Sequence, residues 1–320
     1  MPSKFYHPRY WFIWMGIGLL WLISHLPWSW QMFIGKGLGK LLYLTISKRR
    51  RVSCINLQIA FPELDDKQLL ALNKAHFISI ARALMDSALS WWGSKSKVAS
   101  LTHIEGMEHL EKARKEGNVM LVGAHFTSLE MGGRIVAAHV PIDTVYRPHQ
   151  NDLLEYIVAK KRAKQYGKTI PKSNIRQMLK SIKSGNVAWY ATDQNYRLKG
   201  SILVPFFGED APTNPSTARI AKMTKAQVIP IFTMRLYGEG NKKGDDNRSG
   251  YLLRILPPVA DFPSGDEYQD TLRLNRIIEE QIKEFPEQYL WSHERYKFYQ
   301  SENRNFYKDY IAKHPDSICK

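Results

Sequence analysis

Residues 119–133 read VMLVGAHFTSLEMGG. The first four form a short apolar run, which is typical of a strand buried on both faces of a sheet. The run ends at Gly123, and helical spacing resumes near Leu129. A buried strand followed directly by a helix is the repeating unit of an α/β sheet. This stretch therefore predicts an α/β fold with His125 at the carboxyl end of a strand, where open α/β sheets bind ligands.

The same alternation of short apolar runs and helical patterns continues on both sides of this stretch. It predicts a mixed central sheet flanked by helices. A long helix is expected from Asp65 to Trp92, with Asp65 as its N-cap. Further strands are expected at 101–104, 143–146, 187–191, 201–207, 227–234 and 251–256, and helices at 107–116, 129–138, 151–166, 174–184, 215–224 and 267–285.

His125 and Glu130 are the residues in this pattern that can carry chemistry. Glu130 falls in the first turn or so of the next helix, near enough to fold back on the imidazole. A histidine can take a proton from a hydroxyl, and a carboxylate on its other nitrogen fixes the tautomer and stabilises the cation. We interpret the two as a general-base pair. The spacing alone is common, and a capped helix with a histidine in its entry loop is the alternative.

The charge of the chain points to acidic partners. Its 46 Lys and Arg against 30 Asp and Glu give a net charge of +16, which favours anionic lipid, nucleic acid or an acidic protein. Aromatic residues make up 12% and favour lipid among these, and the chain lacks the signatures of nucleic-acid-binding modules. Cys54 and Cys319 form no disulfide framework and have no metal-ligand spacing, so a reducing cytoplasmic environment is the simplest interpretation.

The amino-terminal segment is predicted to associate with a membrane. Tyr10 to Leu26 is apolar and, as a helix, would reach about 26 Å against a hydrocarbon core of about 30 Å. We expect it to span or insert deeply; an interfacial helix and a buried core helix are the alternatives. A second apolar helix, interrupted by glycines, is expected to follow, then the cations at 48–51. The predicted organisation is membrane-associated helices at 1–47, an α/β domain at 48–300 and a polar tail at 301–320.

Four motifs in a fixed order resemble a known family. They are GAHFTSLEMGG at 123–133, YRPHQNDLLEY at 146–156, WYATDQNY at 189–196 followed by VPFFG, and EQYLWSHERYK at 287–297. Together they resemble the late acyltransferases of lipid A biosynthesis, the lauroyl-type, Kdo2-lipid IVA branch of the lysophospholipid acyltransferase superfamily. The resemblance covers nearly the whole chain as far as Lys297.

The resemblance implies a fold like that of the glycerol-phosphate acyltransferases and an activity. A fatty acyl chain would move from the thioester of acyl carrier protein to a hydroxyacyl group of the lipid A precursor, without a cofactor or metal. The enzyme would sit on the inner membrane, bound to anionic lipid, with its catalytic domain on the cytoplasmic face. No nucleic-acid partner is implied.

The resemblance also implies roles for individual residues. His125 and Glu130 match the family's His-x4-Asp/Glu motif, and the Glu form is closer to laurate- or palmitoleate-transferring members. Arg162 stands at the position of the functional arginine, where a planar cation can bind a phosphate or support the oxyanion; a solvated helix face is the alternative. Asp193 is expected to position substrate or organise the pocket. Arg147, just past a strand end, is expected to contact the same anionic groups as Arg162.

Two other functions remain open from the sequence. A glycerophospholipid acceptor would use the same His-x4-Glu chemistry, although the segment Val204–Gly208 lacks the block usual in glycerol-phosphate members. A non-catalytic, anionic-lipid-binding membrane protein would also explain the charge and the aromatic residues.

Overall fold

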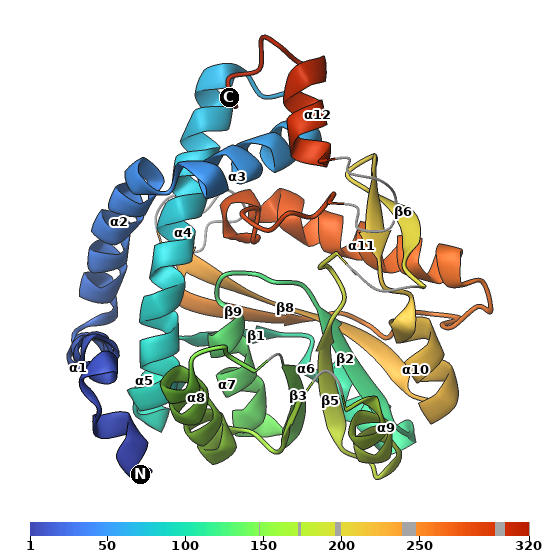
Figure 1. Ribbon diagram of the computed structural model, residues 1–320. Helices are drawn as coiled ribbons and strands as arrows, with labels where there is room; N and C mark the ends of the chain where they lie inside the picture. Colours follow the sequence, from blue (N-terminus) through green and yellow to red (C-terminus); the bar gives the residue numbers. More distant parts are fainter. Residues whose placement is uncertain (147, 172–173, 196–199, 239–247, 298–304, 320) are drawn as a thin grey trace.

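The computed structural model describes residues 1–146, 148–171, 174–195, 200–238, 248–297 and 305–319 (Figure 1). Its centre is a seven-stranded sheet in the order β1-β9-β8-β2-β5-β3-β4. Neighbouring strands are parallel except for β8 and β9, so the predicted mixed sheet is confirmed. The strands are β1 (Thr102–Glu105), β2 (Val119–Gly123), β3 (Ile142–Tyr146), β4 (Thr169–Pro171), β5 (Val187–Ala191), β8 (Gln227–Tyr237) and β9 (Ser249–Ile255).

Strand β2 lies in the middle of the sheet and is buried at every position. Successive side chains point to opposite faces. Val119 and Leu121 pack in one hydrophobic cluster, and Met120 and Val122 pack in another. The continuous apolar run is therefore needed because both faces of this strand are covered.

Helices cover both faces of the sheet. The hydrophobic cluster on one face of the sheet contains residues of α4 (Asp66–Trp92), α6 (Met107–Glu116) and α7 (Leu129–His139). The cluster on the other face contains residues of α9, α10 and α11. The remaining helices of this part are α5 (Lys95–Ser100), α8 (Asp152–Gln165), α9 (Ile175–Lys183), α10 (Ser216–Thr224) and α11 (Glu267–Glu284), with short 3-10 turns at Ser3–Tyr6, Pro8–Tyr10 and Pro286–Gln288. A separate antiparallel hairpin, β6 (Ile202–Phe206) and β7 (Glu209–Thr213), lies beside α11, where Asn275 Nδ2 donates to the carbonyl of Pro205.

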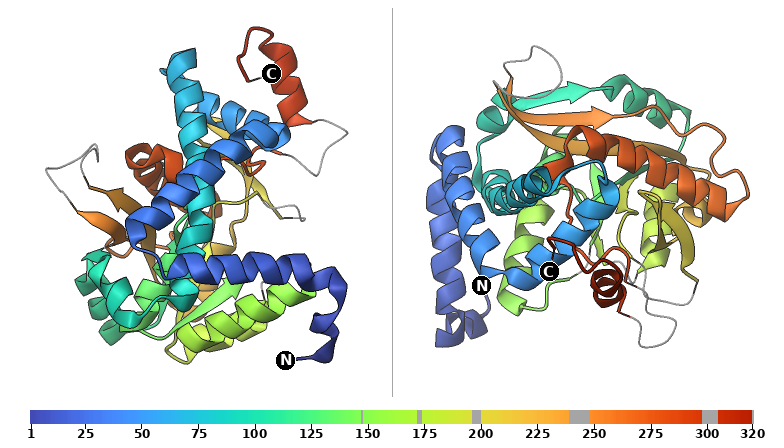
Figure 2. Two further views of the ribbon diagram at one scale, coloured as in Figure 1. Left: turned by 90° about the vertical axis from the view of Figure 1, so that its left-hand side faces the viewer. Right: turned by 90° about the horizontal axis from the view of Figure 1, so that it is seen from above.

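The amino-terminal helices are α1 (Trp11–Ser24), α2 (Trp28–Thr45), α3 (Ser47–Ala60) and α4 (Asp66–Trp92). Asp65 caps α4 in a capping box with Gln68, as expected for its N-cap. Helix α2 is continuous through its glycines and packs along α4, whereas α1 runs in a different direction (Figure 2). A Cβ at Gly39 would collide with the backbone of Ile78, so this glycine permits the close approach of α2 to α4.

The predicted spanning helix is not confirmed. Helix α1 has 14 residues, which reach about 21 Å, and the chain turns at Pro27 before α2 begins. Among the described residues, no helix is both long enough and apolar enough to cross a bilayer.

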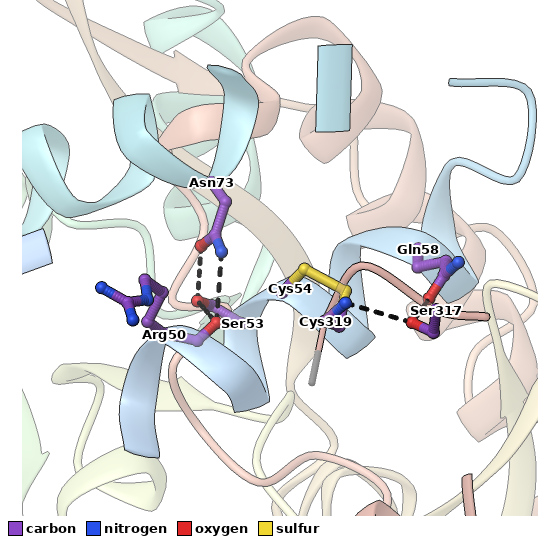
Figure 3. The surroundings of a disulfide bond; sticks show 7 residues. All are labelled: Arg50, Ser53, Cys54, Gln58, Asn73, Ser317 and Cys319. Carbon is purple, nitrogen blue, oxygen red and sulfur yellow. Dashed lines mark hydrogen bonds between the residues drawn. A yellow bond between two sulfur atoms is a disulfide. The ribbon is translucent and has the colours of Figure 1, made fainter. Parts of the chain in front are cut away.

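The two cysteines form a disulfide, which corrects the sequence prediction that they form no disulfide framework. Cys54 of α3 is bonded to Cys319, next to the end of the chain (Figure 3). The predicted polar tail contains α12 (Phe306–Lys313), and Tyr307 Oη donates to Asn56 Oδ1 of α3 at 2.9 Å. The sequence could not indicate this pairing because the two cysteines are 265 residues apart. The cysteines therefore no longer support a reducing compartment.

Candidate active site

Two neighbouring parallel strands bring His125 and Asp193 together. Gly123 at the end of β2 pairs with Ala191 at the end of β5, and each functional residue comes two positions later. The Thr192 amide donates to the Gly123 carbonyl at 3.2 Å and so extends the pairing beyond the strands. The carboxyl ends of the two strands thus deliver both side chains to one edge of the sheet.

The Asp193 carboxylate holds His125 at two points. One oxygen accepts from the imidazole Nδ1 at 2.7 Å, and the other accepts from the His125 backbone amide at 2.9 Å. A carboxylate only accepts hydrogen bonds, so Nδ1 carries the proton in the neutral ring. The Nε2 atom is then left with a lone pair, which is the arrangement that a general base needs.

Burial and charge act in opposite directions on this pair. The side chain of Asp193 is 1% exposed and that of His125 is 27% exposed. Burial alone lowers the pKa of His125, but the charge and hydrogen bond of Asp193 outweigh it, so the pKa lies above its usual value. Burial alone raises the pKa of Asp193, but His125 and backbone amides lower it to about 2. Asp193 therefore stays ionised and stabilises the imidazolium.

Glu130 is engaged elsewhere, so its predicted contact with the imidazole is not confirmed. Its carboxylate accepts from Arg162 Nε at 3.2 Å and Nη2 at 2.5 Å, and from Trp91 Nε1 at 2.9 Å. Tyr166 Oη also donates to it, at 3.4 Å. Glu130 lies in the first turn of α7 and faces α4 and the end of α8, whereas His125 faces β5. The partner of His125 is Asp193, which the sequence had assigned to substrate positioning.

The Glu130 cluster has electrostatics of its own. Burial alone raises the pKa of Glu130, but Arg162, Trp91 and Tyr166 lower it further than burial raises it. Burial alone lowers the pKa of Arg162, and Glu130 raises it to a net value above the usual one. Both groups therefore remain charged. A catalytic role for Glu130 and a ligand-binding role for Arg162 stay predictions, and Arg147 lies outside the described residues.

A buried arginine supports the loop that carries His125. Arg235 on β8 is fully buried, pairs with Asp86 of α4, and donates to the hydroxyl of Thr127. The backbone also anchors the loop, since the Thr127 amide donates to the Gln288 carbonyl at 2.8 Å and the Leu290 amide to the His125 carbonyl at 3.0 Å. No spacing in the sequence links these residues, so sequence reasoning missed them.

The loop after Asp193 is held by the 293–297 segment. Asn195 Nδ2 donates to the Glu294 carbonyl at 3.0 Å, and its Oδ1 lies 3.0 Å from His293 Nε2. Asn195 therefore ties the loop after Asp193 to the 293–297 segment. The following residues, 196–199, lie outside the described part of the chain.

Apolar side chains pack closely beside the pair. A narrow gap there, with no room for a water molecule, touches Gly123 and Thr192, which flank the two loops. Its other walls are the side chains of Val122, Pro230, Phe232, Leu274, Ile277 and Ile278. A larger and more open hollow, about 610 Å³, lies instead near the amino end of β8. Within the described residues, no group of three His, Cys, Asp or Glu side chains could hold a metal ion.

Comparisons with known proteins agree with the resemblance of the motifs. Residues 2–298 match the model of the bacterial lipid A biosynthesis acyltransferase family. The chain is 34% identical over 296 residues to the lipid A biosynthesis palmitoleoyltransferase of Escherichia coli K12, covering 92% of this chain and 94% of that protein. It is 34% identical over 294 residues to the lauroyltransferase of the same strain, covering 91% and 93%.

A third relative is more distant. Identity to the lipid A biosynthesis myristoyltransferase of Escherichia coli K12 is 23% over 292 residues, covering 90% of this chain and 88% of that protein. The higher identity to the palmitoleoyl- and lauroyltransferases than to the myristoyltransferase agrees with the Glu form of the motif at 125–130. The chain therefore belongs to the bacterial lipid A biosynthesis acyltransferase family and is an acyltransferase.

Proposed function

We propose that this acyltransferase moves a fatty acyl chain, lauroyl or of similar length, from acyl carrier protein to a hydroxyacyl group of Kdo2-lipid IVA. The observation that carries the proposal is the His125–Asp193 pair at the carboxyl edge of the sheet, with Nδ1 and Asp193 2.7 Å apart. The palmitoleoyl- and lauroyltransferases among the relatives support the donor class.

In the proposed mechanism, His125 acts as the general base. Its Nε2 takes the proton of the acceptor hydroxyl while the hydroxyl oxygen attacks the thioester carbonyl carbon. The tetrahedral intermediate then collapses, the carbon–sulfur bond breaks, and the imidazolium returns the proton to the leaving thiolate. Asp193 keeps Nδ1 protonated and stabilises the imidazolium between these two transfers. The thioester supplies the activation, so these steps need no cofactor.

We propose that Arg162 contacts an anionic group of the acceptor or the developing oxyanion. Glu130 takes one N–H on Nε and one on Nη2, which leaves the Nη1 side of the guanidinium for a ligand. The side chain of Arg162 is 21% exposed. Glu130 then orients Arg162, which is a role for this carboxylate that fits its contacts.

We also propose that α1 and α2 bind the inner membrane at its surface, with the catalytic domain on the cytoplasmic face. Large apolar side chains are exposed along both helices, and cations follow them. The apolar residues are Trp11, Phe12, Met15, Leu19, Trp21, Leu22, Trp30, Phe33, Leu41 and Leu44, and the exposed cations are Lys36, Lys40, Lys48, Arg49 and Arg51. Exposed apolar rows beside cations favour an anionic membrane interface.

A radiolabel transfer assay tests the reaction. Lauroyl-acyl carrier protein is supplied with either Kdo2-lipid IVA or a lysophosphatidate, and the products are separated by thin-layer chromatography. We expect acylated product with Kdo2-lipid IVA alone. Product with lysophosphatidate alone would establish the glycerophospholipid acceptor instead, and no product with either acceptor would contradict the proposed donor and acceptor.

A further inference from the structure

The segment from Tyr156 to Thr192, which leads into the Asp193 loop, carries only positive formal charge. Residues 156–192 contain no Asp or Glu. In the same segment there are nine cations: Lys160, Lys161, Arg162, Lys164, Lys168, Lys172, Arg176, Lys180 and Lys183. Arg162 forms an ion pair with Glu130. Most of the other cations have no Asp or Glu near them in the sequence.

Helix α9 arranges three of these cations on one face. Arg176, Lys180 and Lys183 are exposed and follow one another at helical spacing, whereas Met178 and Ile182 are buried on the opposite face. Among the described residues, no ion pair involves any of the three cations. The outer face of α9 is therefore a row of uncompensated positive charge.

The amino end of this helix lies at the edge of the sheet that carries the active site. Strands β2, β5, β3 and β4 are adjacent and parallel, so their carboxyl ends meet at one edge. Strand β4 ends there at Pro171, and α9 begins at Ile175. Because β4 is two strands from β5, this point is about 10 Å along the sheet from the end of β5, where Asp193 follows.

We propose that the α9 face, defined by Arg176, Lys180 and Lys183, receives an acidic surface of the carrier protein that delivers the acyl thioester. The inference rests on the proposed function, because it names the surface through which that donor binds. Opposite charges on the two partners speed encounter and fix orientation. A carrier bound there sits beside the catalytic edge, so its thioester can reach His125.

The chemistry of the face favours a protein over a bilayer. Figure 1 shows α9 across the sheet from α1 and α2, which carry the exposed apolar rows. On α9 the only large apolar side chain among the strongly exposed ones is Ile175, which gives a membrane little to bury. The exposed Ile175 beside Arg176 instead suits a small protein–protein interface, in which an apolar side chain is surrounded by charged ones.

Charge reversal tests the face. The triple variant Arg176→Glu, Lys180→Glu and Lys183→Glu is compared with a matched reversal on α6, at Lys112, Arg114 and Lys115, which are also exposed. Each enzyme is assayed with a lauroyl carrier-protein donor and with lauroyl-pantetheine, which lacks the protein. We expect the α9 variant to raise KM for the carrier donor about tenfold or more, with kcat for lauroyl-pantetheine unchanged. The α6 variant should change neither.

Other outcomes overturn the proposal in distinguishable ways. Equal rises of KM in the α9 and α6 variants would show that only the net charge of the enzyme matters. A loss of activity with both donors would show damage to the fold or to the active site. Unchanged KM in the α9 variant, or a loss of binding to anionic vesicles without any kinetic change, would remove the carrier from this face. Failure of the unmodified enzyme with both donors would instead contradict the proposed function. A weaker salt dependence of KM in the α9 variant than in the unmodified enzyme is the supporting control.

Discussion

The site contains two pairs of a carboxylate and a basic side chain, and the pairs differ in how they are built. His125 and Asp193 come from loops 68 residues apart, and the side chain of Asp193 is 1% exposed. Glu130 and Arg162 come from two helices, and their side chains are 14% and 21% exposed. The first pair leaves a ring nitrogen free for proton transfer. The second pair uses a forked guanidinium to fix a carboxylate.

The difference teaches that closeness in sequence does not select the partner of a catalytic histidine. Glu130 is five residues from His125, but a helix begins between them at Leu129 and turns the carboxylate toward α4 and α8. Parallel strands instead deliver the residues after their carboxyl ends to one edge, however far apart in the chain. The register of Gly123 with Ala191 decides the pairing.

The largest effect is expected for His125→Ala. Losing the general base should lower kcat by about 10²- to 10⁴-fold, measured with saturating donor and acceptor. The variant also removes a charged partner of the buried Asp193 carboxylate, so the melting temperature should fall somewhat, and kcat is compared at a temperature at which both proteins are folded. A variant that keeps near-normal kcat would show that another group takes the proton.

The pH profile separates the two carboxylates most directly. Because Asp193 raises the pKa of His125, the unmodified enzyme has its base form only above that raised pKa, and kcat/KM rises with pH through it. Asp193→Asn removes the negative charge, so the rise should move to lower pH while kcat falls at least about tenfold. Glu130→Gln should leave the position of the rise unchanged. A shift in Glu130→Gln and none in Asp193→Asn would restore the sequence assignment of the pair.

The Arg162→Lys variant probes the second pair. A lysine retains the charge but loses the planar fork that holds both oxygens of Glu130, so activity should fall about tenfold. If Arg162 binds the acceptor, the loss appears in KM for Kdo2-lipid IVA; if it supports the oxyanion, kcat falls for every acceptor alike. The pH profile should keep its position in either case. Unchanged kcat and KM would leave Arg162 with a structural contact to Glu130 alone.

Much of the fold could be predicted because its central elements carry strong periodic signals. The strands expected at 119–123 and 187–191 have the observed bounds of β2 and β5, and the helix expected at 107–116 is α6. Strand β4 has only three residues, and β7 reads EDAPT, which has no apolar alternation. Both were missed, since their pairing depends on neighbours that the local sequence does not contain.

The motifs named the residues of the candidate site but did not give their pairings. The structure groups His125, Glu130, Arg162 and Asp193 into two pairs, and their functional roles stay predictions. The pairing of His125 with Asp193 follows from the order β2-β5 in the sheet, which a list of strands does not fix. The support from Arg235 joins α4, β8 and the catalytic loop, so it exists only in the folded chain.

The smallest effect is expected at Thr127, where the support of the His125 loop can be weakened without touching either pair. Thr127→Val keeps the shape of the side chain and removes the hydroxyl that Arg235 and Ser79 contact, whereas Thr127→Ser retains a hydroxyl. Losing a hydrogen bond to a charged group costs about 1.5–3 kcal/mol, and a looser loop sets His125 less well against the substrate. We expect kcat to fall about three- to tenfold in the valine variant, with little change in the serine variant.

Thr224→Val, which removes a buried hydroxyl on α10, should leave kcat unchanged. If Thr127→Val lowers the melting temperature but not kcat, the arginine supports the fold alone, and the geometry of His125 depends only on Asp193 and the backbone contacts of the loop.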